Sequence, residues 1–231
     1  VNVNPLGGAA MAGATWPIDP FITAELLGMP ALCANSMDAI GDRDHVIETL
    51  AALSIISMHL SRIAEELVLW TTAEYGFAEL GDAFTTGSSI MPQKKNADIA
   101  ELMRGKTGRV YGALVSILTI TKALPLTYNK DNQEDKEGMF DAFDTILMLL
   151  QVLPPMLDTL VFFPETLAKA AIGGFSLATD IADQIAKRGL PFREAHEISG
   201  RLVARCIREG RTLESLSAAE WAEVSNVFAD A

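Results

Sequence analysis

The residues best suited to chemistry lie in one polar loop, Gly81–Ala97, whose glycines, serines and paired lysines interrupt the helical periodicity on either side. Loops carry function more often than the helices that flank them. Five of the 18 Lys and Arg residues fall within sixteen positions: Lys94, Lys95, Arg104, Lys106 and Arg109. In an acidic chain this cluster predicts a local site for anions, although a solvated helix start would carry the same charges.

The charge and composition of the chain limit its partners. The 231 residues have a net charge of −12, and a field of this sign repels a phosphate backbone, so nucleic acid is not expected to bind. A membrane span is not expected either. The most apolar stretch, 145–163, contains Gln151, two prolines and Asp158, which a bilayer-spanning helix rarely carries together.

The cysteines and histidines are too scattered for a metal site. Cys33 and Cys206 suit neither a disulfide framework nor a thiolate site, so we expect two free thiols in a reducing compartment, the cytoplasm. His45, His59 and His196 do not have the spacing of metal ligands. The sequence therefore predicts no metal.

Three long segments carry the apolar periodicity of helices. The first, 42–75, has no Pro or Gly in 34 positions and would reach about 50 Å, which suits a bundle of long packed helices. The second covers 98–122. The third covers 134–163, where Pro154 and Pro155 are expected to break or kink the helix. Strand signals are nearly absent, so the predicted fold is all-α.

Glycines mark one face of the second segment. Gly105, Gly108 and Gly112 are three and four positions apart, which leaves the backbone open to close approach. We therefore expect another helix to cross there, in a packing role without chemistry.

A change of pattern after Phe163 predicts a second, smaller domain. Shorter helical segments follow, separated by glycines, and Ser217 with Glu220 resembles a capping box for the last helix. We expect a central helical-bundle domain over 1–165, carrying the polar loop, and a smaller C-terminal helical domain over 166–231.

Residues 87–96, Gly-Ser-Ser-Ile-Met-Pro-Gln-Lys-Lys-Asn, resemble the signature loop of the superfamily of fumarases, aspartases, adenylosuccinate lyases and argininosuccinate lyases. The run from Gln93 to Lys95 is similar to the argininosuccinate lyases in particular, a family that delta crystallins also resemble. Further supporting stretches are 5–7 with 12–13, 35–38 with 42–44, 128–131 with 133–136, and 189–196. Ala97 replaces the usual proline and Gly8-Ala9 alters a Gly-Ser-Gly run, but neither change removes a reactive group.

The resemblance covers essentially the whole chain and corresponds to the family's central and C-terminal part, without its N-terminal domain. The final residues also stop short of the family's usual terminus. The resemblance implies a β-elimination that splits argininosuccinate into arginine and fumarate, a step of arginine biosynthesis that uses no cofactor. Charge then builds up on a substrate carboxylate, so cations and amide donors must be placed in advance.

Seven residues of this sequence match positions that have a role in the family's reaction. Ser88 matches the proposed base, and an alcohol serves as a base only if loop amides and Lys94 stabilise its alkoxide. Lys94 and Asn96 match positions that hold the developing charge, and Glu101 matches a residue that supports the acid group. The positions that match those gripping the substrate's carboxylates are Tyr128, Gln133 and Lys136. Without such a role, the lysines would be solvated charges and Tyr128 a half-buried aromatic.

The general acid is not expected in this chain. None of the three histidines matches the family's catalytic histidine, which belongs to the N-terminal part, so we expect the 231 residues alone to be inactive. The family forms homotetramers whose active sites are shared between subunits. The resemblance implies the same self-association here.

Two other functions stay open. A structural protein of the crystallin kind would keep the bundle without catalysis, because a fold alone does not fix an activity. Another fumarate-releasing lyase of the superfamily, acting on adenylosuccinate or aspartate, would keep the chemistry with a different substrate. The intact loop speaks against the first, and the Gln93 to Lys95 run speaks against the second.

Overall fold

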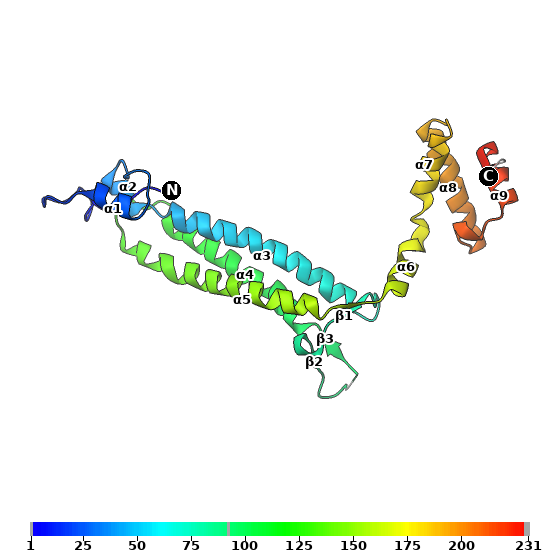
Figure 1. The fold of residues 1–231 in the computed structure, drawn as a ribbon, viewed down its shortest axis with the longest axis horizontal. Coiled ribbons are helices and arrows are strands. Elements are labelled where there is room, and N and C mark those ends of the chain that lie inside the picture. Colours follow the sequence, from blue (N-terminus) through cyan, green and yellow to red (C-terminus); the bar gives the residue numbers. More distant parts are fainter. Residues whose placement is uncertain (1, 92, 229–231) are drawn as a thin grey trace. The chain divides into compact units, whose positions relative to one another are not determined.

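The computed structural model describes residues 2–91 and 93–228, so Val1, Pro92 of the signature loop and 229–231 lie outside the described part. The chain consists of two compact units, Val1–Phe162 and Phe163–Ala231. The sequence placed the domain boundary close by, at residue 165. Helices dominate both units (Figure 1), which confirms the predicted all-α class.

Three long helices form the first unit: α3 (Asp44–Trp70), α4 (Asp98–Thr121) and α5 (Asp135–Asp158). They lie side by side, each antiparallel to the next along the chain (Figure 1). The shorter elements are α1 (Pro20–Leu26), α2 (Ser36–Gly41), β1 (Ala78–Glu79), η1 (Asp82–Phe84), β2 (Thr86–Gly87), β3 (Lys95–Asn96), η2 (Lys130–Glu134) and β4 (Val161–Phe162).

The first two long helices follow their sequence signals closely. α3 covers 44–70 of the predicted 42–75, and Asp44 in its first turn suits the positive end of the helix dipole. α4 covers 98–121 of the predicted 98–122, with Asp98 and Glu101 in its first turn. Both helix predictions are confirmed.

Pro154 and Pro155 do not break the helix, because α5 runs through both prolines and ends at Asp158, and the alternative of a kink stays a prediction. A proline inside a helix removes the hydrogen bond to the carbonyl four residues earlier. Those carbonyls belong here to Leu150 and Gln151, which are exposed, so water can replace the missing donors. The helix therefore continues to its natural end.

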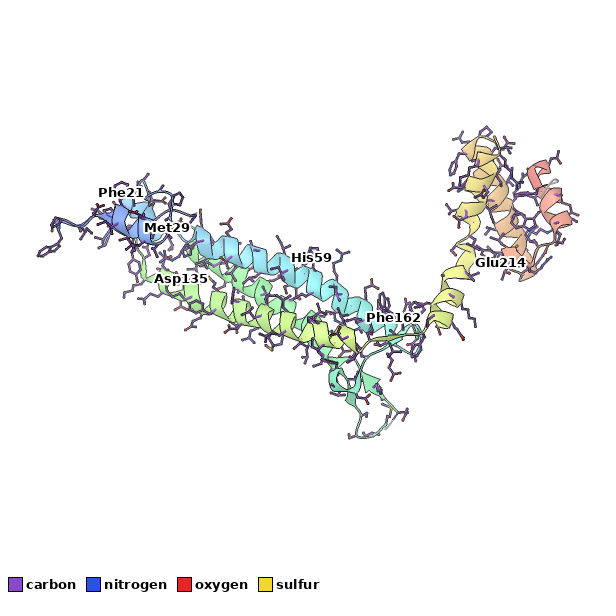
Figure 2. All side chains as sticks on the ribbon, in the orientation of Figure 1. Phe21, Met29, His59, Asp135, Phe162 and Glu214 are labelled. Carbon is purple, nitrogen blue, oxygen red and sulfur yellow. The ribbon has the colours of Figure 1, made fainter. Side chains whose placement is uncertain are left out.

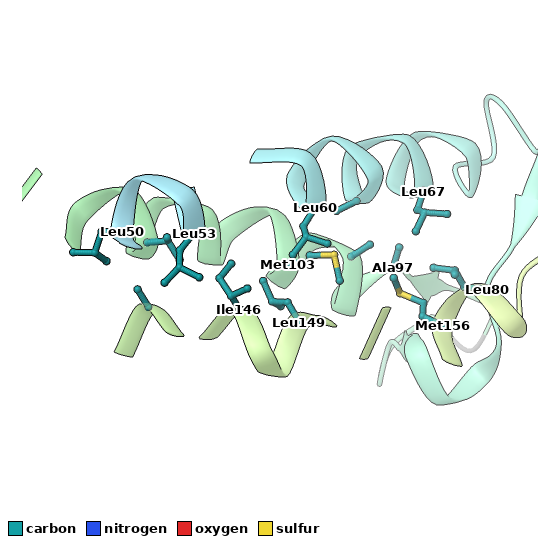
Figure 3. Packing of buried hydrophobic residues seen from close by; sticks show 14 of the residues in the cluster. Leu50, Leu53, Leu60, Leu67, Leu80, Ala97, Met103, Ile146, Leu149 and Met156 are labelled. Atoms are coloured by element: carbon teal, nitrogen blue, oxygen red, sulfur yellow. The ribbon is translucent and has the colours of Figure 1, made fainter. Parts of the chain in front are cut away.

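One apolar core joins the three helices (Figure 3). Leu50, Leu60 and Leu67 recur on one face of α3, as the sequence pattern predicts. Met103 of α4 and Met156 of α5 are fully buried in the same cluster. Full burial of such a side chain contributes about 1.5–3 kcal/mol, so this core is the main support of the bundle.

The glycines of α4 do not lie against another helix of this chain, contrary to the prediction. Gly105, Gly108 and Gly112 are exposed, and a Cβ added at any of them would meet no described atom within 4 Å. The face of α4 that α3 and α5 cover carries larger side chains, because they bury more apolar area. Its buried residues are Ala100, Met103, Thr107, Val110 and Ile117.

Two short antiparallel ladders lie at one end of the bundle. β1 pairs with β4, with Ala78 opposite Phe162, and β2 pairs with β3, with Gly87 opposite Lys95. Each strand has only two residues, too few for the alternation that identifies a strand in a sequence. The ladders leave the all-α class unchanged.

Two stretches, Asp44–Trp70 and Lys130–Asp158, are long and apolar enough to cross a membrane by length and composition alone. The core helices of a bundle pass the same test, and both stretches contribute to the shared core described above. The expected absence of a membrane span stays a prediction.

The second unit contains shorter helices around its own core, which includes Ile185, Leu202 and Cys206. Its elements are α6 (Pro164–Ile172), η3 (Gly173–Phe175), α7 (Ala178–Lys187), α8 (Phe192–Glu209), η4 (Leu213–Ser215), α9 (Ala218–Val224) and η5 (Asn226–Phe228). Ser217 and Glu220 form the predicted capping box at the start of α9, which confirms it. Cys33 and Cys206 are both free thiols, as expected.

A buried ion pair fixes the start of α5 to the start of α3. Arg43 Nε donates to Asp135, whose side chain is 4% exposed, and Arg43 Nη1 donates to the carbonyls of Ile40 and Asp42. The ammonium group of Lys136 also lies 2.6 Å from Asp135. Burial alone would raise the pKa of Asp135, but hydrogen bonds from Lys136 and Arg43 outweigh burial and hold this pKa below its ordinary value.

Asp135→Asn is expected to lower the free energy of unfolding by roughly 3–5 kcal/mol near neutral pH, because it leaves Arg43 buried without its counter-charge. Folding lowers the pKa of Asp135, so this stability is present above the ordinary carboxyl pKa of about 4 and is lost as the pH falls through the lowered value. Urea denaturation of both proteins across this pH range measures the difference, which should narrow in acid. A difference that does not change with pH would contradict this role of Asp135.

Asn132→Leu is expected to stabilise the fold. Asn132 is buried in η2, and neither polar atom of its amide has a hydrogen-bond partner among the described residues, which costs about 1–3 kcal/mol. The matched control is Asn129→Leu, which should destabilise, because Asn129 Nδ2 donates to the carbonyls of Pro125 and Thr127 at 3.0 and 3.2 Å. Urea midpoints measure both changes, and a lower midpoint for Asn132→Leu would show that this amide is satisfied.

Candidate functional site

The β2–β3 ladder brings the two ends of the signature loop together. Gly87 lies opposite Lys95 and Thr86 lies opposite Asn96. Ser88 leaves the ladder directly after Gly87, and Lys94 enters it directly before Lys95. The two residues expected to act as base and charge holder are therefore the first and last residues of the turn.

The hydroxyl of Ser88 accepts two backbone hydrogen bonds. The N–H groups of Ile90 and Met91 each donate to Ser88 Oγ at 3.2 Å. Donors that already point at an oxygen stabilise the negative charge that develops on it, which is what a serine needs to act as a base. Ser89, its neighbour, is exposed and accepts no such pair of amides in the described structure.

The two adjacent lysines of the loop have different surroundings. Lys94 is exposed, and its ammonium group has no hydrogen-bond or ion-pair partner in the described part of the chain. Lys95 Nζ lies 2.6 Å from Glu79 and 2.6 Å from Asp82. Only Lys94 therefore has an ammonium group that is unengaged and available to a substrate anion.

Asn96 and Glu101 lie at the same end of the bundle as the loop. Asn96 is half-buried in the β2–β3 ladder, and Glu101 is exposed in the first turn of α4. The hydroxyl of Thr86 donates to the carboxylate of Asp98, which links the ladder to the start of that helix. Four of the seven predicted site residues thus share one end of the first unit.

The other three predicted residues form a second group. Tyr128 is 40% exposed, Gln133 is exposed on η2, and Lys136 is exposed in the first turn of α5 beside Asp135. Open side chains of these types can bind the carboxylates of a ligand.

The two groups lie at opposite ends of the bundle. Figure 2 shows Asp135 at one end and Phe162, a residue of the β1–β4 ladder, at the other. The 24-residue helix α4 runs between them and is about 36 Å long at 1.5 Å per residue. One chain therefore does not bring Ser88 and Lys136 together at a single site.

The predicted anion cluster is smaller than the sequence suggested. Lys95, Arg104 and Arg109 are each paired with carboxylates, which neutralises three of the five cations. Within the described residues, Lys94 and Lys106 form no ion pair. The cluster is thus a set of ion pairs beside one unengaged loop lysine.

Sequence reasoning missed the carboxylates that hold these cations. Glu79 lies 16 positions before Lys95, and Asp135 lies 92 positions after Arg43. Such partners have no fixed spacing, so only the folded chain reveals them. The described residues contain no group of three or more His, Cys, Asp or Glu side chains placed to hold a metal ion.

Two family models match the chain. The model described as "Lyase" matches residues 1–112, and the model described as "Argininosuccinate lyase C-terminal" matches residues 175–231. The first match contains the signature loop with Ser88 and Lys94, and the second lies within the second unit.

Curated argininosuccinate lyases are similar to almost the whole chain. That of Desulforamulus reducens is 56% identical over 229 residues, which are 99% of this chain and 50% of the relative. That of Moorella thermoacetica is 55% identical over 228 residues, which are 99% of this chain and 49% of the relative. The chain thus spans about half the length of the curated relatives it matches.

Solved structures extend the likeness to the fold. An EDDS lyase in complex with formate is 34% identical, with a TM-score of 0.81 over 96% of this chain and 44% of that chain. A class II fumarase from Schistosoma mansoni has a TM-score of 0.77 at 14% identity, over 98% of this chain and 52% of that chain, and shows the fold alone. Together, the family models and the curated relatives show that the chain is similar, over almost its whole length, to about half of an argininosuccinate lyase.

Proposed function

We propose that this chain supplies the base and the charge-holding residues of an argininosuccinate lyase, which splits L-argininosuccinate into L-arginine and fumarate in arginine biosynthesis. The observation that carries the proposal is the pair of loop amides on Ser88 Oγ beside the unengaged Lys94. The 56% identity to the D. reducens enzyme supports the choice of substrate.

In the proposed reaction, Ser88 as alkoxide takes a proton from the succinate carbon next to a carboxylate. The electron pair of that C–H bond forms the double bond of fumarate. The neighbouring C–N bond breaks, its electrons go to the nitrogen of arginine, and a general acid gives that nitrogen a proton. Lys94 and Asn96 hold the carboxylate on which charge builds up.

The proposed acid lies outside these 231 residues, and Glu101 supports it. The substrate's carboxylates are bound by Tyr128, Gln133 and Lys136. The elimination needs only this proton transfer and charge stabilisation, so no cofactor is included.

The active site is proposed to be shared between copies of the chain in a homotetramer. The separation of about 36 Å along α4 supports this, because the signature loop does not reach the carboxylate-binding residues of its own chain. The exposed glycines of α4 support it as well. Gly112 directly follows Tyr111, which lines an apolar groove between α3 and α4 together with Ile55, Met58 and Val115, a surface suited to helices of other copies.

The cytoplasm is the proposed location. Two free thiols, one half-buried and one buried, suit a reducing compartment. Small metabolites are the proposed ligands, and the acidic chain gives no reason to include nucleic acid.

A different fumarate-releasing lyase is the main alternative, because a solved relative at 33% identity is an EDDS lyase variant with bound fumarate. A catalytically silent, crystallin-like protein is the other, and the intact Ser88 site speaks against it. Comparing the turnover of argininosuccinate, adenylosuccinate, aspartate and EDDS separates these functions. A preference for any of the last three would reject the proposed substrate.

The activity is best tested in a completed enzyme, a chimera in which this chain is joined to the part of the D. reducens enzyme that it does not cover. Ser88→Ala is expected to lower kcat about 10²–10⁴-fold, because a positioned base contributes that much. Ser89→Ala is the matched control and should retain most of the activity. Fumarate release, followed by its ultraviolet absorbance, measures both, and full activity of Ser88→Ala would exclude it as the base.

Mixing two inactive variants tests the shared site. Completed enzymes carrying Ser88→Ala or Lys136→Met are each expected to be nearly inactive, but refolding them together should restore activity. If Ser88 and Lys136 of one site come from different chains, roughly a quarter of the sites in an equal mixture contain both intact residues. Refolding each variant alone is the control. A mixture as inactive as its parents would mean that both groups serve the same chain.

A further inference from the structure

The adjacent lysines of the signature loop point to a division of labour. Lys94 leaves its ammonium group unengaged among the described residues, whereas Lys95 is bound by two carboxylates at once. Glu79 Oε1 and Asp82 Oδ1 each lie 2.6 Å from Lys95 Nζ. Lys95 therefore has no free charge to offer a substrate, and its contacts call for another explanation.

The two carboxylates belong to a segment that is anchored to the bundle. Glu79 lies in β1 opposite Val161 of β4, and Asp82 begins η1. Between them, Gly81 packs closely on Thr159, the residue that follows α5, so that an added Cβ would lie 2.7 Å from the Thr159 side chain. The segment thus gives Lys95 a fixed point outside the loop.

The position of Lys95 determines the position of Ser88. Lys95 lies opposite Gly87 in a ladder of only two residue pairs, and Ser88 follows Gly87 along the chain. A ladder this short has little stability of its own, because isolated two-stranded hairpins are marginal in water. Fixing the Lys95 side chain therefore restricts Ser88 and Lys94, the residues that directly flank the ladder.

These ion pairs contribute little to the fold itself. The side chains of Lys95, Glu79 and Asp82 are 48%, 50% and 85% exposed, and exposed pairs add little to global stability. Both carboxylates also raise the pKa of Lys95, which keeps it charged throughout the working pH range. A local function, placing the loop, agrees with contacts of this kind.

We propose that Glu79 and Asp82 are positioning residues that clamp the signature loop through Lys95, so that Ser88 and Lys94 are held in their working geometry. The clamp leaves the chemistry to Ser88 and Lys94, and it rests on the proposed function only in assigning the base to this loop. It makes the second lysine of the pair a structural part of the hairpin.

Hydrogen–deuterium exchange tests the clamp without relying on activity. In the completed enzyme, Lys95→Met should speed exchange of the peptide that contains the amides of Ile90 and Met91, since both donate to Ser88 Oγ. Lys94→Met, which removes the neighbouring charge, should leave that exchange unchanged. Equal protection in wild type and Lys95→Met would overturn the proposal whether or not the enzyme turns over argininosuccinate.

Kinetic measurements on charge-reversed variants provide a second test of the clamp. Lys95→Glu should lower kcat about 10²-fold with little change in KM, because a small displacement of a base has an effect of that size. Adding Glu79→Lys and Asp82→Lys reverses all three charges and should recover most of the lost kcat at an unchanged thermal midpoint. A triple variant as slow as Lys95→Glu would overturn the clamp. If the wild type is inactive but Lys95→Met still speeds exchange of the Ile90 and Met91 amides, only the proposed function is rejected.

Discussion

The length of α4 is the constraint on which the rest of the structure depends. Its 24 residues separate the signature loop from the start of α5 by about 36 Å, far beyond the reach of any side chain. The core residues shared with α3 and α5 hold the three helices in register, so this separation is fixed. This separation is the reason for proposing that chemistry joining the two ends uses more than one chain.

Each end of the bundle is stabilised in its own way. At the loop end, two short ladders and the contacts of Lys95 restrict a turn whose amides already point at Ser88. At the other end, the buried Asp135 joins Arg43 and Lys136, so the first turn of α5 is tied to α3. Both ends are thus held by contacts within the chain itself, and groups fixed in this way are the condition for electrostatic stabilisation of a transition state.

The sequence predicted the features that depend on local pattern. α4 begins and ends almost where its periodicity does, and the capping box of Ser217 forms, because both signals act within a few residues. The two-residue strands and the partners of Lys95 were not predictable, since two residues show no alternation and ion pairs have no fixed spacing. The site residues came from resemblance to the family, and their separation along α4 came from the structure.

Some predictions failed because the sequence does not show what surrounds a local signal in the folded chain. The glycines of α4 do mark a surface open to close approach, but no described residue of this chain covers it. The prolines of α5 were expected to break or kink the helix, but the two carbonyls that lose their donors belong to exposed residues and the helix continues. In both cases the local signal was read correctly and its surroundings were not.

The most direct test of a site shared between chains is a distance between chains. One completed enzyme is spin-labelled at Ser89 and another at Lys130, so that after mixing, dipolar coupling between the two kinds of label arises only between subunits. A shared site predicts a coupling distance well below the length of α4, about 36 Å. The absence of any distance shorter than that length would contradict it.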